Sequence, residues 1–136
     1  MKAVAVFLMF LSVCNTAAAI EDIDVGDVSN FGNQLLGKTV RFRACAVHAY
    51  ECLHNEGYYC VNVDEVDEKS NSCKFAKNEL DTLLISQSVY SFKQIKSLIK
   101  RKDVVRVTGE VALGNTKLDG EKEIKSAPLL FVKKID

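Results

Sequence analysis

The sequence of 136 residues contains no tryptophan, a single proline and no excess of charge, with 18 basic residues against 18 acidic ones. This balance gives no electrostatic basis for a nucleic-acid or anionic-membrane partner, because neutralising phosphates requires clustered bases. With 48% hydrophobic residues, the chain is neither disordered nor low in complexity. After residue 19, no apolar run reaches the roughly 20 residues that span a bilayer. We therefore expect one globular domain without a membrane span.

The sequence also lacks the motifs of common enzyme classes. Neither G-x-S-x-G nor H-E-x-x-H is present. The two histidines, His48 and His54, lie close together near one expected loop. No C-x-x-C pair supports thioredoxin-like chemistry or covalent haem attachment. These absences predict a protein that is not an enzyme and uses no cofactor.

Residues 1–19 have the composition of a secretory signal peptide. Lys2 supplies a positive charge, residues 3–13 an apolar run, and residues 17–19 the small side chains that a signal peptidase recognises. We expect cleavage after Ala19, which leaves one domain of 136 − 19 = 117 residues over 20–136. A buried N-terminal helix is the alternative, disfavoured because acidic residues follow at once. The protein is expected in the periplasm or outside the cell.

Four cysteines remain after cleavage: Cys45, Cys52, Cys60 and Cys73. An even count in a small exported chain predicts two disulfides. Three connectivities are possible, and strand geometry favours one. If residues 38–48 and 57–64 pair around a loop centred near Leu53, then Cys45 lies about opposite Cys60. We therefore expect Cys45–Cys60 with Cys52–Cys73.

Two groups of residues suggest metal sites as alternatives. Thiolate and imidazole ligands for zinc or copper would come from Cys45, His48, Cys52 and His54, but their spacing is not a common structural-zinc pattern. The acidic residues at 64–68 lack the glycine and closing glutamate of a calcium-binding EF-hand loop. We therefore expect no metal.

The hydropathy pattern predicts a mainly β domain. Residues 38–48 alternate between an inward face and an outward face, as do residues 58–64 after a loop, which predicts a hairpin. Further strands are expected at 82–87, 103–113 and 124–135, with Gly109 at a bulge or bend. A helical turn over 80–84 is the alternative to the first of these. A polar loop is expected at 64–73 and an irregular N-terminus at 20–30.

Two helices are expected between these strands. A short helix over 29–36 would end at Gly37 and turn Phe31, Leu35 and Leu36 toward the core. A longer helix would begin at the capping box formed by residues 91–94 and continue to residue 101.

The segments GKTVRFRACAV, YYCVNV and VVRVTGEV carry a family resemblance. With the helix placed between the third and fourth strands, residues 35–135 resemble small exported bacterial OB-fold proteins, which are similar to the anticodon-binding OB domain. The resemblance implies a five-stranded Greek-key barrel with one helix between strands 3 and 4, preceded here by the short N-terminal helix.

OB barrels usually bind with strands 2 and 3 and the flanking loops. The resulting ligand-binding candidates are Arg41, Arg43, Tyr50, His54, Tyr58 and Asn62. Aromatic and guanidinium groups can stack on, or hydrogen-bond to, a small molecule, an oligosaccharide or a peptide. A structural subunit or an inhibitor of an envelope or secreted protein is the alternative. The sequence specifies neither the ligand or protein partner nor the oligomeric state.

Overall fold

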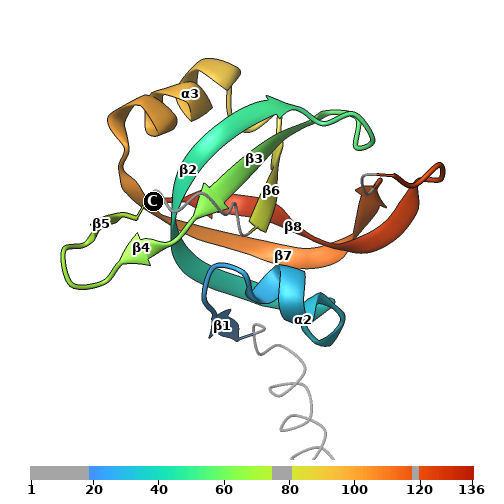
Figure 1. Ribbon diagram of the computed structural model, residues 1–136, viewed down its shortest axis with the longest axis horizontal. Coiled ribbons are helices and arrows are strands. Elements are labelled where there is room, and N and C mark those ends of the chain that lie inside the picture. Colours follow the sequence, from blue (N-terminus) through green and yellow to red (C-terminus); the bar gives the residue numbers. More distant parts are fainter. Residues whose placement is uncertain (1–18, 75–80, 118–119) are drawn as a thin grey trace, which may run out of the picture.

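The computed structural model of the protein describes residues 19–74, 81–117 and 120–136. The predicted signal peptide therefore lies outside the described residues, apart from Ala19. Over the part that is described, the chain is mainly β with two helices, and α3 lies above the strands in Figure 1 while α2 lies below them. Neither described helix has the length and apolar character needed to cross a membrane.

The principal sheet contains six strands, and its pairings return to one of them. The order after the N-terminal strand is β2 (Thr39–Glu51), β3 (Tyr58–Asp64), β6 (Asp81–Ser86), β8 (Lys125–Ile135) and β7 (Val104–Thr116). An additional pairing joins β7 to β2, so these five strands form a closed series of ladders. The first half of β2, up to Cys45, pairs with β7, and the second half pairs with β3.

Period-two alternation correctly predicted the three strands that form most of this series. The inward residues of β2, β3 and β7 are buried in one apolar core with Leu130 of β8 and Ile95 of α3. Gly109 lies at a register shift in the β7–β8 ladder, as expected. An added Cβ there would lie 2.6 Å from the carbonyl oxygen of Phe131, so the close approach of β8 requires glycine.

Three short strands were not predicted. β1 (Ile20–Asp22) pairs in parallel with the start of β2, in a segment expected to be irregular. β4 (Val66–Asp67) and β5 (Ser72–Cys73) form a small hairpin inside the segment expected to be a polar loop. Each has two or three residues, too few for an alternation to be visible in the sequence.

The longer helix, α3 (Phe92–Arg101), has the predicted capping box. The backbone N–H of Gln94 donates to Ser91 Oγ at 3.1 Å, and the backbone N–H of Ser91 donates to Gln94 Oε1 at 2.8 Å. Ile95 turns into the core. Local chemistry alone therefore located this helix and its first residue.

The short helix, α2 (Asp27–Leu35), begins two residues earlier than expected and has non-helical backbone angles at Phe31. Its buried residues are Val28, Gly32 and Leu35. Phe31 and Leu36 are 51% and 38% exposed, so the prediction that both face the core is wrong. The buried positions follow the i, i+4, i+7 spacing of one helix face, which passes beside Phe31.

A buried carboxylate fixes the start of α2 from a distant strand. Asp81 of β6 is 4% exposed and accepts hydrogen bonds from the Gly26 N–H at 2.7 Å, the Ser29 N–H at 3.1 Å and the Ser29 hydroxyl at 2.6 Å. Desolvation raises the pKa of the Asp81 carboxyl, while these hydrogen bonds oppose the rise. Asp81 thus caps a helix that supplies no side-chain cap of its own.

All four cysteines form disulfides, but the expected pairing is wrong. The bridges are Cys45–Cys73 and Cys52–Cys60, with Cα–Cα distances of 5.7 and 5.1 Å. β2 continues to Glu51, and its register with β3 shifts between Ala46 and His48. As a result, Cys60 lies opposite Tyr50, and Cys45 lies opposite Asp64 at the far end of β3.

Candidate functional site

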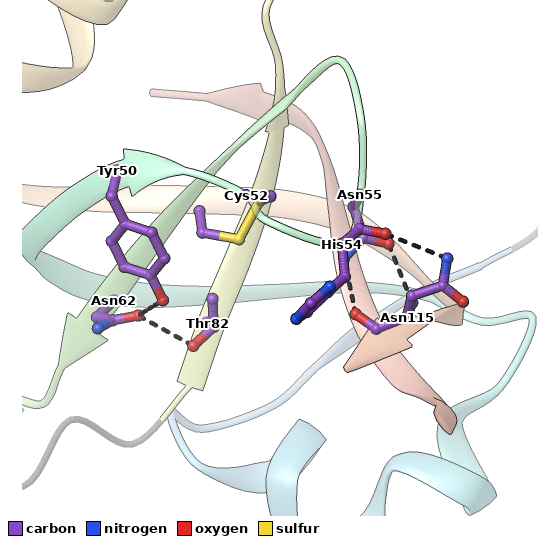
Figure 2. Close-up of a disulfide and its surroundings, with 8 residues drawn as sticks. Tyr50, Cys52, His54, Asn55, Asn62, Thr82 and Asn115 are labelled. Atoms are coloured by element: carbon purple, nitrogen blue, oxygen red, sulfur yellow. Dashed lines mark hydrogen bonds between the residues drawn. A yellow bond between two sulfur atoms is a disulfide. The ribbon is translucent and has the colours of Figure 1, made fainter. Parts of the chain in front are cut away.

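Three polar side chains meet on the outside of adjacent strands and form what we call the outer strand cluster: Tyr50, Asn62 and Thr82. Asn62 lies opposite His48 on one side and Thr82 on the other. Its Oδ1 accepts a hydrogen bond from the Thr82 hydroxyl at 3.0 Å and one from the Tyr50 hydroxyl at 3.5 Å (Figure 2). The Tyr50 ring also lies 5.5 Å from that of His48, and Tyr50 remains 38% exposed. The cluster therefore offers an accessible ring and hydroxyl groups held by strands.

The loop over residues 52–57 is fixed at its base and at its side. The Cys52–Cys60 disulfide closes it, and the Cys52 N–H donates to the Tyr58 carbonyl at 3.1 Å. Asn55 exchanges two hydrogen bonds of 2.8 and 3.0 Å with the backbone of Asn115 in β7. Figure 2 shows the disulfide between the outer strand cluster and this anchored part of the loop.

His54 belongs to this loop and not to the outer strand cluster. Its backbone carbonyl accepts a hydrogen bond of 3.2 Å from the Asn115 side chain (Figure 2). The neighbouring Leu53 is 89% exposed. The loop therefore presents an apolar tip on a constrained backbone.

Tyr58 lies apart from Asn62 although both face outward from β3. Cys60 and its disulfide separate them along the strand. The Tyr58 ring packs edge-on against Phe131 of β8, with ring centroids 5.4 Å apart. Together they line a shallow groove of about 250 Å³ beside the Glu110–Lys133 ion pair.

Arg41 and Arg43 lie in a different groove, over the half of β2 that pairs with β7. Arg41 makes a two-point contact with Asp22, with Nε–Oδ1 and Nη2–Oδ2 distances of 2.9 and 3.2 Å. This hydrogen bonding lowers the pKa of the Asp22 carboxyl and raises that of Arg41. Arg43 donates to the Asn71 side chain in the β4–β5 connection and lies 4.0 Å from Glu68.

Of the six predicted ligand-binding residues, the structure brings Tyr50 and Asn62 together in the outer strand cluster. It places Arg41 and Arg43 together in the other groove, and His54 and Tyr58 lie outside both groups. Sequence reasoning missed Thr82, Asn115, Phe131 and Arg106, which line these surfaces. A correct register for β6 would have indicated Thr82, since Asn62 lies directly opposite it. No local signal marks the other three, because their positions depend on how β7 and β8 close the sheet.

No protein-family model and no curated protein matches the chain. Among solved structures, it is similar to an aspartyl-tRNA synthetase from Leishmania major Friedlin, with a TM-score of 0.46 and 16% identity over 89% of this chain. The chain spans 21% of that synthetase's length. It is also similar to the OBody AM2EP06 bound to hen egg-white lysozyme, with a TM-score of 0.46, 15% identity and coverage of 86% of this chain and 94% of the other. Both similarities concern the fold alone.

Proposed function

We propose that the protein is an exported, disulfide-stabilised binding protein with an OB-type five-stranded Greek-key barrel and no catalytic activity. The closed order β2–β3–β6–β8–β7 and the position of α3 between β6 and β7 support the barrel. The two disulfides are compatible with an oxidising compartment, the periplasm or the cell exterior.

The outer strand cluster is the observation that carries the binding role. Its hydroxyl and amide groups are positioned by strands, and the adjacent loop is held by a disulfide and by Asn55. Groups fixed before binding lose little conformational entropy when a ligand arrives. An exposed tyrosine ring beside hydrogen-bonding groups suits an uncharged polar ligand such as an oligosaccharide, a small molecule or a peptide.

The chemistry of the described residues supports a role without catalysis. The outer strand cluster consists of a phenol, an amide and an alcohol that hydrogen-bond to one another, and none of these three groups is a carboxylate or an imidazole. The neighbouring His48 ring packs against the Tyr50 ring. The four cysteines from Cys45 to Cys73 are all in disulfides, so none of them supplies a thiolate nucleophile.

Leu53 favours a second candidate function, that of an interaction subunit or an inhibitor of an envelope or secreted protein. Its side chain is 89% exposed at the tip of a loop that is fixed at both ends. A rigid loop with an apolar tip can enter a cleft of a partner with little loss of entropy.

The test is a ¹⁵N NMR titration of the protein with neutral hexasaccharides and a neutral hexapeptide. We expect the amide signals of Tyr50, Asn62 and Thr82 to shift, and Asn62→Ala to weaken binding about tenfold, because the acceptor that holds the Tyr50 and Thr82 hydroxyl groups is lost. Thr108→Val on β7 is the matched control and should bind normally. Equal binding by the Asn62 variant, or shifts confined to other strands, would contradict the proposal. Leu53→Ser should leave this binding unchanged and weaken only a protein partner.

A further inference from the structure

A groove of about 660 Å³ lies away from the outer strand cluster, between the N-terminal segment, the β2–β7 ladder and the end of β3 with the β4–β5 hairpin. Its volume lies within the range of small-molecule sites. Eight charged side chains line it, four basic and four acidic: Arg41, Arg43, Lys74, Arg106, Asp22, Asp24, Glu65 and Glu68. The acidic side chains do not neutralise all four basic side chains equally.

The basic side chains differ in how they are neutralised. Arg41 is paired with Asp22, and Lys74 is paired with Glu65 at 3.0 Å. Arg43 is 4.0 Å from Glu68 and is held by Asn71. For Arg106, no carboxylate in the described ranges lies within ion-pair distance, and Arg106 interacts with Asp22 less strongly than Arg41 does. The positive charge of the groove is therefore least compensated at Arg43 and Arg106.

These two arginines are direct neighbours. Arg43 of β2 lies opposite Arg106 of β7 in the antiparallel register, and both strands continue into the core through Ala44 and Val105. Like charges directly opposite each other on a sheet are destabilising. An anion between the two guanidinium groups would remove this repulsion and would accept their charge-assisted hydrogen bonds.

The backbone under this pair is well anchored. Arg106 donates its N–H to the Asp136 carbonyl at 3.0 Å and accepts the Asp136 N–H at 2.9 Å. On its other side, β7 pairs with β2. Arg106 thus projects from a strand that has partners on both sides, which keeps its backbone in a defined position beside that of Arg43.

We propose that Arg43 and Arg106 bind an oxyanion group, a carboxylate or a phosphate, of a small ligand in this groove. Planar guanidinium groups match the geometry of both oxyanions. The carboxylates of Asp22, Asp24, Glu65 and Glu68 on the groove walls repel a large polyanion, so the ligand is small and carries few negative charges. This site is independent of the proposed function of the outer strand cluster.

The test is calorimetric titration of the full protein with inorganic phosphate and with succinate, in chloride buffer of low ionic strength. We expect saturable binding of at least one probe and a loss of about tenfold or more in affinity for both Arg43→Gln and Arg106→Gln. Arg101→Gln on α3 is the control, since it removes the same charge outside the groove, at a residue paired with Asp103. It should bind like the parent protein.

Comparing the two probes shows whether the site binds a phosphate or a carboxylate. Binding of phosphate alone, succinate alone or both assigns the group and supports the site. The absence of binding for both probes at about 10 mM overturns the proposal, as does an equal loss of affinity in all three arginine variants, which would show a general charge effect. Asn62→Ala should not change oxyanion binding, so failure here is distinguishable from failure of the proposed function.

Discussion

The two disulfides should stabilise the fold by unequal amounts, and replacing each pair separately measures the difference. The bridges close chain segments with sequence separations of 28 for Cys45–Cys73 and 8 for Cys52–Cys60. The loop-entropy relation for these lengths gives about 3.6 and about 2.5 kcal/mol at 25 °C. Loss of the longer bridge should therefore lower the free energy of unfolding by about 1.1 kcal/mol more than loss of the shorter one.

The loss of packing is similar in the two double variants, so removing Cys45–Cys73 should still lower the free energy of unfolding more than removing Cys52–Cys60. Each bridge has one buried partner, Cys45 at 1% exposure and Cys60 at 8%. Changing both cysteines of a pair to alanine removes one buried sulfur atom in either case, and the resulting cavity costs are comparable. The difference between the two double variants is thus more informative than either absolute value.

Urea unfolding followed by circular dichroism gives the required free energies, because the chain has no tryptophan to serve as a fluorescent reporter. The parent, C45A/C73A and C52A/C60A are compared at one pH and temperature. Equal losses, or a larger loss for C52A/C60A, would refute the loop-entropy reasoning for this fold.

The same prediction has a direct chemical check. Cleavage after basic residues and after glutamate separates the cysteines, and the structure predicts that fragment 44–51 is linked to 70–74 and fragment 52–56 to 57–65. Isolation of fragment 44–51 linked to 57–65 would refute this pairing.

Three further substitutions test the packing of the fold by urea unfolding. Burial raises the folded-state pKa of Asp81, so its contribution to stability is complete below the unfolded pKa and is lost as pH rises through the folded one. Asp81→Asn should remove this part of the pH dependence, and an unchanged profile would contradict the assignment. Gly109→Ala should lower stability by more than about 1 kcal/mol, because its Cβ would meet the Phe131 carbonyl at 2.6 Å. Ser91→Ala should cost about 1 kcal/mol by removing the cap of α3, and a neutral result would show that packing alone holds the helix.

Features encoded within a few residues were predictable from the sequence. The alternation in β2, β3 and β7, the capping box at Ser91 and the bend at Gly109 each depend on neighbouring residues along the chain. The disulfide pairing was not predictable in this way. It depends on the register of the hairpin: β2 continues to Glu51, which pairs with Tyr59, so Cys60 lies opposite Tyr50 and five residues away from Cys45.

The candidate site was only partly predictable for a related reason. Alternation correctly placed Arg41 and Arg43 on the outward side of β2, whereas Tyr50 was expected in the loop after the strand. The pattern also could not show that β2 changes its neighbour along its length. Up to Cys45 the strand lies beside β7, and from there onward it lies beside β3. The outward residues of β2 are therefore distributed over two surfaces in the fold.

This change of neighbour also explains why the two proposed sites can act separately. Cys45 marks the position where β2 leaves β7 and joins β3, and its disulfide to Cys73 ties the β4–β5 hairpin to the same point. The arginine groove precedes this position and the outer strand cluster follows it. A substitution in either site leaves the strand pairs beneath the other unchanged, and effects at sites without shared partners are usually additive. A variant carrying both Asn62→Ala and Arg106→Gln should therefore lose each binding activity to the same extent as the corresponding single variant, and a smaller or larger loss would show that β2 couples the two surfaces.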